Sequence, residues 1–149
     1  MSVVRLTHRS PYAARLMFEL VADVESYPLF LPYCAAARVR SREPDGAGEI
    51  VHAELVGAYK ILRETYASEV RLQPPARIEM RQTKGPFESL NGVWVFTDEG
   101  DGSRIDFEVR FDMRFGLLRR IVAARVESAA QIMLDAFAKR ADALYCTVS

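Results

Sequence analysis

Three glutamates in the middle of the chain are the residues best suited by type to acid–base catalysis. Glu54, Glu64 and Glu69 occur where apolar and polar residues alternate, as in β-strands. A carboxyl group that lines an apolar cavity has a raised pKa and can act as a general acid. Strand alternation puts Glu64 on the face of Tyr66 and Glu69 on the opposite face. Because glutamates in sheets usually face solvent, an enzyme is the weakest of our functional hypotheses, and we assign no catalytic residue.

Other reactive residues show no pattern typical of a metal site or a nucleophile. The two histidines, His8 and His52, have no His, Cys or carboxylate at metal-ligand spacing. The two cysteines, Cys34 and Cys146, are far apart and form no CxxC motif, which is typical of proteins in a reducing compartment. No GxSxG motif surrounds a serine. We therefore predict no metal and no required cofactor.

Bulky apolar residues are the more informative set. Aromatic residues alternate along the last two predicted strands, and an alanine-rich helix face cannot cover all of them. The residues are either plain core or the wall of a lipophilic cavity, and their collective excess favours the cavity. The predicted mouth comprises Tyr27, Phe30 and Leu31; the sheet wall comprises Tyr66, Trp94, Phe96, Phe107, Val109 and Phe111; the helix lid comprises Val126, Met133 and Phe137.

Four arginines form the strongest local charge feature. Arg114, Arg119, Arg120 and Arg125 lie in a segment without acidic residues, near the start of a predicted helix. Cations there oppose the helix dipole, so the cluster costs some stability. Interleaved apolar residues make it resemble a patch that contacts a membrane surface. The alternatives are a solvated face with salt bridges to strand carboxylates such as Asp112, and contact with rRNA phosphates.

Periodicity predicts the elements that position these residues. Ser10 is the predicted N-cap and Pro11 the first residue of a short helix that ends near Asp23. From Cys34 to Phe115 the apolar period is 2, which predicts six strands, and residues 2–8 add a seventh. The predicted turns are at 44–46, 56–58, 74–75, 84–86 and 100–102.

A single long helix is predicted from about Gly116 to Thr147. Its predicted apolar stripe comprises Leu118, Val122, Val126, Ala129, Met133, Ala136, Phe137, Ala141 and Leu144. Strands followed by one long helix predict an α+β domain in which a curved antiparallel sheet wraps around the helix. The apolar segment 27–33 follows the first helix, where we expect it to close one end of the space between sheet and helix.

The bulk properties fit one domain, residues 1–149, in a reducing compartment. The 20 basic and 20 acidic residues balance, so no global field points to nucleic acid, and we predict no DNA partner. We see no signal peptide and no uncharged run long enough to span a bilayer. We expect a cytoplasmic protein with peripheral contact at the inner face of the membrane.

Four segments resemble one known family: LVADVESYPLFLPYC, AELVGAYKILRETYASEV, GPFESLNGVWVF and AFAKRADALY. They resemble the coenzyme Q-binding family, a START-like branch of the helix-grip superfamily that also holds polyketide cyclases and lipid-transfer domains. The resemblance covers residues 10–145 and implies a helix-grip fold whose cavity holds ubiquinone or a related polyprenyl lipid. It implies a non-enzymatic quinone carrier or chaperone that supports respiratory electron transport. Tyr33 and Ala58 depart from the family pattern, which leaves ligand size and headgroup open.

Two rival hypotheses stay open beside the quinone carrier. A bacterial ribosome-association toxin shares much of the same pattern, which implies a protein that binds the ribosome and blocks subunit association. The other rival is an enzyme. Because the superfamily also holds polyketide cyclases, the resemblance implies that such an enzyme would be a cyclase or dehydratase. For the carrier, the expected partners are a lipophilic small molecule, the membrane, and quinone-biosynthesis or respiratory proteins.

Overall fold

The computed structural model describes residues 2–59, 62–113 and 119–146 of the 149-residue chain. Strand β1 (Ser2–Ser10) is followed by helix α1 (Ala14–Ala22) and the 3-10 helix η1 (Val24–Leu29). The remaining elements are β2 (Cys34–Asp45), β3 (Gly48–Tyr59), β4 (Leu62–Gln73), β5 (Arg77–Lys84), β6 (Ser89–Glu99), β7 (Gly102–Asp112) and α2 (Arg119–Tyr145). This order confirms the predicted α+β class.

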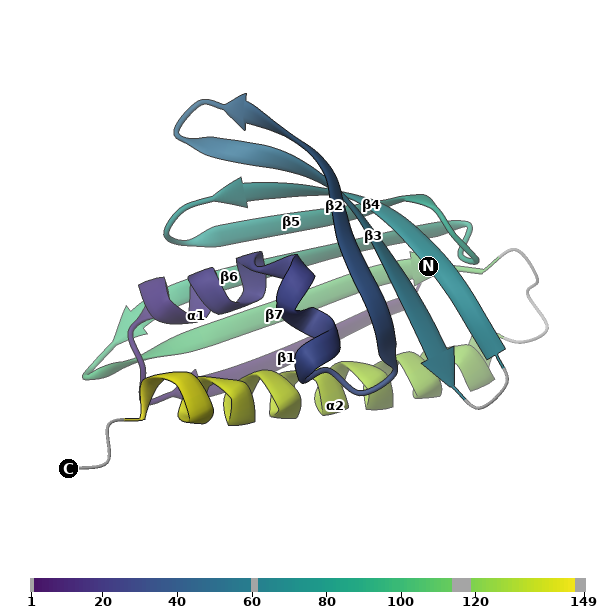
Figure 1. Cartoon of the computed structure of the whole chain (residues 1–149). Coiled ribbons are helices and arrows are strands. Elements are labelled where there is room, and N and C mark those ends of the chain that lie inside the picture. Colours follow the sequence, from purple (N-terminus) through teal and green to yellow (C-terminus); the bar gives the residue numbers. More distant parts are fainter. Residues whose placement is uncertain (1, 60–61, 114–118, 147–149) are drawn as a thin grey trace.

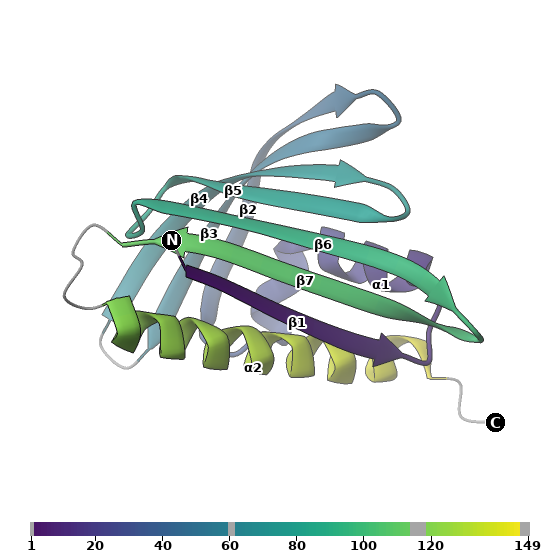
Figure 2. The same cartoon turned by 180° about the vertical axis from the view of Figure 1, so that it is seen from behind.

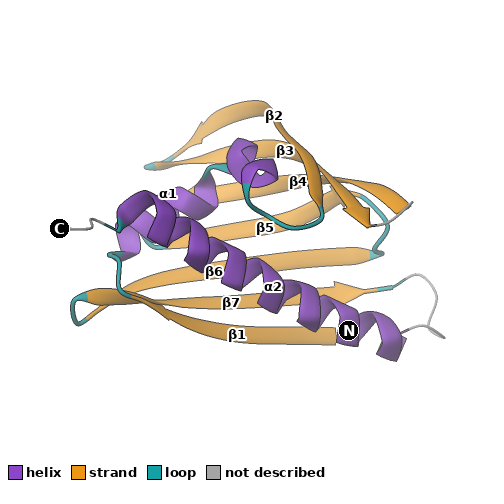
Figure 3. Cartoon of the chain, turned by 60° about the horizontal axis from the view of Figure 1, so that its bottom comes forward, coloured by secondary structure: helices purple, strands orange, loops and turns teal. Residues whose placement is uncertain are grey.

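The seven strands of the described residues form one antiparallel sheet, in the spatial order β1-β7-β6-β5-β4-β3-β2. The sheet is strongly curved, as expected for twisted antiparallel strands, and the limb formed by β2, β3 and β4 bends toward α2 (Figures 1 and 2). Figure 3 shows α2 crossing the concave face diagonally, with β1 on one side and β2 on the other. Helices α1 and η1 lie on the same face, so the space between sheet and helices is the interior of the molecule.

Strand β7 shows why the sheet has one wet and one buried face. Ile105, Phe107 and Phe111 are buried, whereas Arg104 and Arg110 point outward to Glu99 and Glu108. The strict period of 2 in the sequence predicts this arrangement, and the structure confirms it.

The register between β6 and β7 confirms the predicted facing of the aromatic residues. Trp94 is opposite Phe107, Phe96 is opposite Ile105, and all four side chains are buried. A slip of one residue would place Trp94 and Phe96 in solvent instead.

The apolar face of α2 differs in part from the predicted stripe. Ala130 and Leu134 are buried, whereas Ala129 and Leu144 are exposed, contrary to the prediction. Phe137 is buried, as predicted. The error arises because alanines occur on several sides of this helix, so residue type alone does not select the face. Leu118, and the side chain of Val122, lie outside the described residues.

The start of α1 also differs from the prediction. Ser10 ends β1, and its Oγ accepts a hydrogen bond from the backbone N–H of Tyr12 at 3.1 Å. The N-cap position is Ala13, which has no side-chain cap. The carboxylate of Asp98, at the end of β6, accepts the N–H of Ala14 at 2.9 Å instead. The capping group is therefore distant in sequence, and the local pattern cannot reveal it.

One of the five predicted turns is wrong. Residues 56–58 lie inside β3, where Gly57 is opposite Glu64 of β4. A Cβ atom on Gly57 would lie 3.3 Å from Cε2 of Tyr66, which is tighter than nine in ten real contacts of a Cβ atom. The glycine therefore marks a close approach of an aromatic ring to the strand, not a reversal of the chain.

Candidate functional site

Aromatic side chains fill the part of the interior that lies next to α1. The Trp94 ring lies 4.5 Å from the Phe107 ring and 5.6 Å from the Phe137 ring, between centroids. Phe96 lies 5.6 Å from Phe18 of α1. Trp94 is 7% exposed and Phe137 is 2% exposed. We call these five residues and their surroundings the closed half, because side chains from sheet and helices contact one another across it.

The inner faces of the strands change along their length. On β3, Val51 and Ala53 are buried but Leu55 is half-buried; on β4, Leu72 and Val70 are buried but Tyr66 is half-buried. Strand β6 shows the same change from buried Phe96 and Trp94 to half-buried Leu90. The interior is therefore fully covered near α1 and only partly covered toward the other end of these strands.

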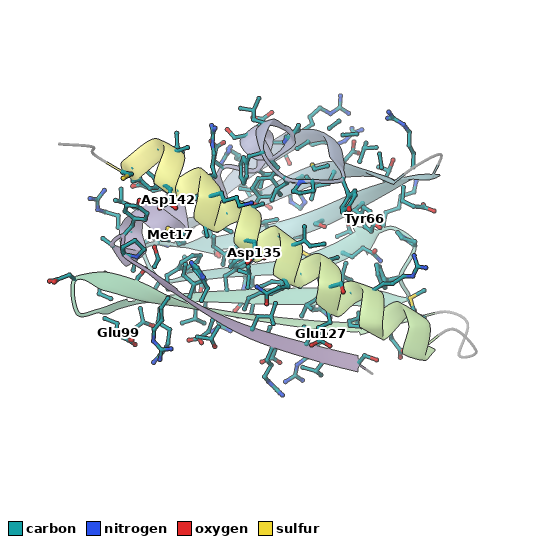
Figure 4. The ribbon with its side chains drawn as sticks, turned by 90° about the horizontal axis from the view of Figure 1, so that it is seen from below. Met17, Tyr66, Glu99, Glu127, Asp135 and Asp142 are labelled. Atoms are coloured by element: carbon teal, nitrogen blue, oxygen red, sulfur yellow. The ribbon has the colours of Figure 1, made fainter. Side chains whose placement is uncertain are left out.

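We call the partly covered end the open half. Its half-buried inner residues come from four strands, the loop before β6, and α2: Leu55, Tyr66, Met80, Phe87, Leu90, Val126 and Met133. The Tyr66 and Phe87 rings lie 6.5 Å apart, and Phe87 lies 5.9 Å from Phe111. In Figure 4, Tyr66 and β1 lie on opposite sides of α2. Met17, which belongs to the closed half, lies near the C-terminal end of that helix.

Tyr66 places one polar group on this apolar surface. Burial raises the pKa of Tyr66, and the charge of Glu64 raises it further. The phenol therefore stays neutral over the physiological range and can donate a hydrogen bond to a carbonyl oxygen of a bound molecule. The geometry supports binding of an apolar molecule with at least one acceptor group.

The predicted mouth, formed by Tyr27, Phe30 and Leu31, lies against α2. The rings of Tyr27 and Phe30 lie 5.5 Å and 5.3 Å from Phe137, and 6.2 Å from each other. The hydroxyl of Tyr27 donates to the carbonyl oxygen of Val21, and burial is the main cause that raises the Tyr27 pKa. Leu31 is half-buried against the core. The segment thus joins the end of α1 to the middle of the long helix.

The predicted lining residues are divided between the two halves. Trp94, Phe96, Phe107 and Phe137 belong to the closed half, where they contact one another or α1. Tyr66, Val126 and Met133 belong to the open half, whereas Val109 and Phe111 are buried on β7.

Four residues of the open half, Leu55, Met80, Phe87 and Leu90, are absent from the predicted lining. The period-2 pattern could have found Leu55, because it lies opposite Tyr66 in the register of β3 and β4. Phe87 lies in a loop, where no period selects its direction.

Two of the three candidate general acids lie on the outer face of the sheet. Arg40 Nε donates to Glu54 at 2.5 Å, and this hydrogen bond is the main cause that lowers the pKa of Glu54. Arg81 donates to Glu69 at 2.6 Å and lowers the pKa of Glu69 in the same way. A general acid at neutral pH needs the opposite shift. Glu64 lies on the face of Tyr66, as predicted, but is exposed.

The predicted arginine patch is described only in part. Arg114 lies outside the described residues, as do the side chains of Arg119 and Arg120, which begin α2. Arg125 is exposed. The membrane and rRNA interpretations of this patch therefore stay predictions.

Metal binding and membrane spanning find no support in the described ranges. Among these residues, no three His, Cys, Asp or Glu side chains come together as a metal site would require. His52 Nε2 lies 3.2 Å from Glu43, an ordinary pair on the strand surface. Within residues 2–59, 62–113 and 119–146, none of the helices has the length and apolar character needed to cross a bilayer.

A curved antiparallel sheet around a long C-terminal helix, with short helices after the first strand, defines a helix-grip fold of the START type. The solved structure of a START superfamily protein from Mycobacterium smegmatis has the same fold, with a TM-score of 0.82 and 17% identity. The match covers 95% of this chain and 98% of that one. This likeness confirms the predicted fold class.

Residues 10–138 match the family described as "Polyketide cyclase / dehydrase and lipid transport", and the chain belongs to this family. The protein named ribosome association toxin RatA of Pseudomonas aeruginosa is 38% identical over 136 residues, which cover 91% of this chain and 92% of that protein. Coenzyme Q-binding protein COQ10 homolog B of Xenopus laevis is 27% identical over 139 residues, which cover 90% of this chain and 55% of that protein. The START-like resemblance is confirmed, and both groups predicted from the sequence are among the relatives.

Proposed function

We propose that the chain binds ubiquinone or a related polyprenyl lipid on the apolar surface of the open half, between the sheet and α2. The observation that carries the proposal is the group of half-buried inner side chains in the open half, among them Tyr66, Phe87 and Met133. In this role the protein is a carrier or chaperone that supports respiratory electron transport, and it needs neither a catalytic residue nor a cofactor.

The energetics of a prenyl tail suit such a surface. Each CH2 group removed from water contributes about 0.8 kcal/mol, so a few isoprene units supply strong binding without polar recognition. The Tyr66 hydroxyl is suited to a quinone carbonyl oxygen, because a phenol donates one hydrogen bond and a carbonyl accepts it. The relative named for coenzyme Q binding supports the same ligand class.

The direct test is to identify what the purified protein carries. Protein made in a ubiquinone-producing bacterium, purified without detergent and extracted with solvent, is expected to release a prenyl quinone detected by mass spectrometry. Leu55→Trp fills the open half and is expected to lower the recovered quinone at least tenfold. Val56→Trp is the matched control, because the neighbouring residue faces the other side of β3. Wild-type protein without lipid, or equal recovery from Leu55→Trp, would contradict the proposal.

A second candidate function is association with the ribosome, which the printed name of the Pseudomonas aeruginosa relative favours. Contact with rRNA requires cations that are available to phosphates. Many strand arginines are already engaged with carboxylates, for example Arg5 with Glu108 at 3.3 Å and Arg81 with Glu69 at 2.6 Å. The proposed contact surface is the predicted arginine patch at the start of α2, because its segment holds four arginines and no acidic residue.

Sucrose-gradient profiles of over-expressing cells distinguish the two candidates. A ribosome-binding protein raises the ratio of separate to joined subunits, and replacing Arg119 and Arg120 by serine restores the ratio. An unchanged profile with the wild-type protein removes this candidate, while the quinone measurement is unaffected by it.

The proposed location follows from the ligand. A quinone with an isoprenoid tail resides in the membrane, so a carrier works from the cytoplasm at the inner membrane face. The proposed protein partners are enzymes that make quinones or use them in respiration. Fractionation of cells, with the protein followed in the cytosolic and membrane fractions, tests this location.

A further inference from the structure

A groove runs along α2, beside the connection between η1 and β2. It has a volume of about 520 Å3 and is lined in part by Phe30, Pro32, Ile132 and Arg140. The connection lies beside α2 in both Figure 1 and Figure 3. The residues of α2 that line the groove are spaced by three and four, so they form one side of the helix, next to the side that faces the interior.

Two cations of this groove lack carboxylate partners. Among the described residues, Lys139 and Arg140 form no salt bridge, unlike Arg5 and Arg81 of the strands. The Arg140 guanidinium carbon lies 5.4 Å from the centre of the Phe30 ring, and its Nε is shielded from solvent without a hydrogen-bond partner. One acidic residue also lines the groove, Asp135, whose Oδ1 accepts a hydrogen bond from Gln131 at 3.1 Å. The Arg140 guanidinium therefore has N–H groups without acceptors in the described part of the chain, in a site that is partly shielded from solvent.

Large apolar side chains are exposed around the same groove. Leu29, at the end of η1, is 72% exposed, and Ile132, which lines the groove, is 39% exposed. Tyr33, just beyond Pro32, is 52% exposed. Exposed aliphatic side chains beside uncommitted cations match a phospholipid surface, which offers both hydrocarbon and phosphate.

We propose that this groove docks the protein on an anionic phospholipid membrane. Arg140 and Lys139 bind lipid phosphates, and Leu29 and Ile132 insert among the acyl chains. Phe30 connects this surface to the interior, because one side of its ring faces Arg140 and its other contacts are Tyr27 and Phe137. The inference goes beyond the proposed function: it assigns a membrane contact at the C-terminal half of α2, independent of the interior ligand.

The test is co-sedimentation with vesicles of phosphatidylcholine, with and without phosphatidylglycerol. The wild-type protein is expected to bind only the anionic vesicles. A basic residue close to an anionic surface contributes roughly fivefold in binding, so Lys139→Gln with Arg140→Gln is expected to weaken binding roughly twenty-five-fold. Lys139→Gln alone and Leu29→Ser change exposed side chains, so they remain informative if the double variant unfolds; each is expected to weaken binding severalfold.

Matched controls change exposed residues of the same types elsewhere. Lys84→Gln removes an exposed cation at the end of β5, and Val3→Ser removes an exposed aliphatic side chain on β1. Both are expected to bind like the wild type. Binding that is lost only when Arg119 and Arg120 become serine, or that is equal with neutral vesicles, overturns the proposal.

Two further results bear on the proposal in a definite way. If a soluble acidic peptide displaces the protein from anionic vesicles at micromolar concentration, the groove is a peptide site and the membrane proposal fails. Recovery of quinone from the purified Lys139→Gln and Arg140→Gln protein reports on the interior site alone. Loss of vesicle binding with retained quinone therefore supports both proposals separately.

Discussion

The closed and open halves are built from the same strands but differ in what covers them. In the closed half, α1 and α2 both cover the sheet, and Trp94 meets Phe107 and Phe137. In the open half, Leu55, Tyr66 and other inner residues have the same inward facing but remain half-buried. Helix α1 covers only one part of the inner face, whereas α2 crosses all of it, so the inner residues beyond α1 have less cover. The comparison teaches that the closed half contributes most of the buried aromatic core, whereas the open half has the apolar surface at which we propose that a ligand binds.

The largest expected effect is the difference in lost stability between a substitution in the closed half and one in the open half. Phe137→Ala removes a buried ring that contacts Tyr27, Phe30 and Trp94, so we expect a loss of about 4 kcal/mol in the free energy of unfolding. Phe87→Ala, in the open half, is expected to cost roughly half as much, because that ring is only half-buried. Urea unfolding measures both. Equal losses would mean that the halves do not differ as described.

Added ligand is expected to stabilise the protein by acting on the open half. A short-tail ubiquinone at about 100 times its dissociation constant raises the free energy of unfolding by about 2.7 kcal/mol. The Leu55→Trp variant is expected to lose this gain and Val56→Trp to keep it, as thermal unfolding with and without ligand will show. A gain that survives Leu55→Trp would place the ligand elsewhere.

A smaller effect tests how the closed half is fixed. Asp98→Ala removes the carboxylate that accepts the Ala14 N–H at the start of α1. We expect a loss of about 1 kcal/mol, typical of a removed N-terminal cap, with Asp98→Asn retaining most of the stability. Ser10→Ala, at the position that the sequence predicts as the cap, is expected to cost less than Asp98→Ala.

The smallest effect concerns the outer face, which both halves share. Hydrogen bonds from Arg40, Arg81 and Arg110 lower the pKa of their glutamate partners. A lowered folded-state pKa means that this stabilisation is complete above the unfolded value of about 4.3 and is lost as the pH falls through the folded value. Between pH 6 and pH 3 we expect wild-type stability to decline.

The decline is expected to be shallower when the partner glutamates Glu54, Glu69 and Glu108 are replaced by glutamine. These pairs are exposed, so the difference is small. Denaturant unfolding at several pH values measures it, and a variant that declines as steeply as the wild type would contradict the assignment.

Much of this architecture follows from the sequence because β-strand periodicity is strict. The alternation from Ile105 to Phe111 predicts which face of β7 is buried, and the order of elements predicts a sheet around one helix. The errors have physical causes: Gly57 makes room for a ring from the next strand, and Asp98 caps a helix 84 residues away. The division into halves depends on where α1 stops covering the sheet, which no local pattern encodes.

The most direct test of the two-halves account is an NMR titration of isotope-labelled protein with a short-tail ubiquinone. The account predicts shifts concentrated at Leu55, Leu90 and Met133, with Met17 and Ile105 of the closed half unchanged. Shifts centred on Met17 and Ile105, or no shifts at saturating quinone, would contradict it.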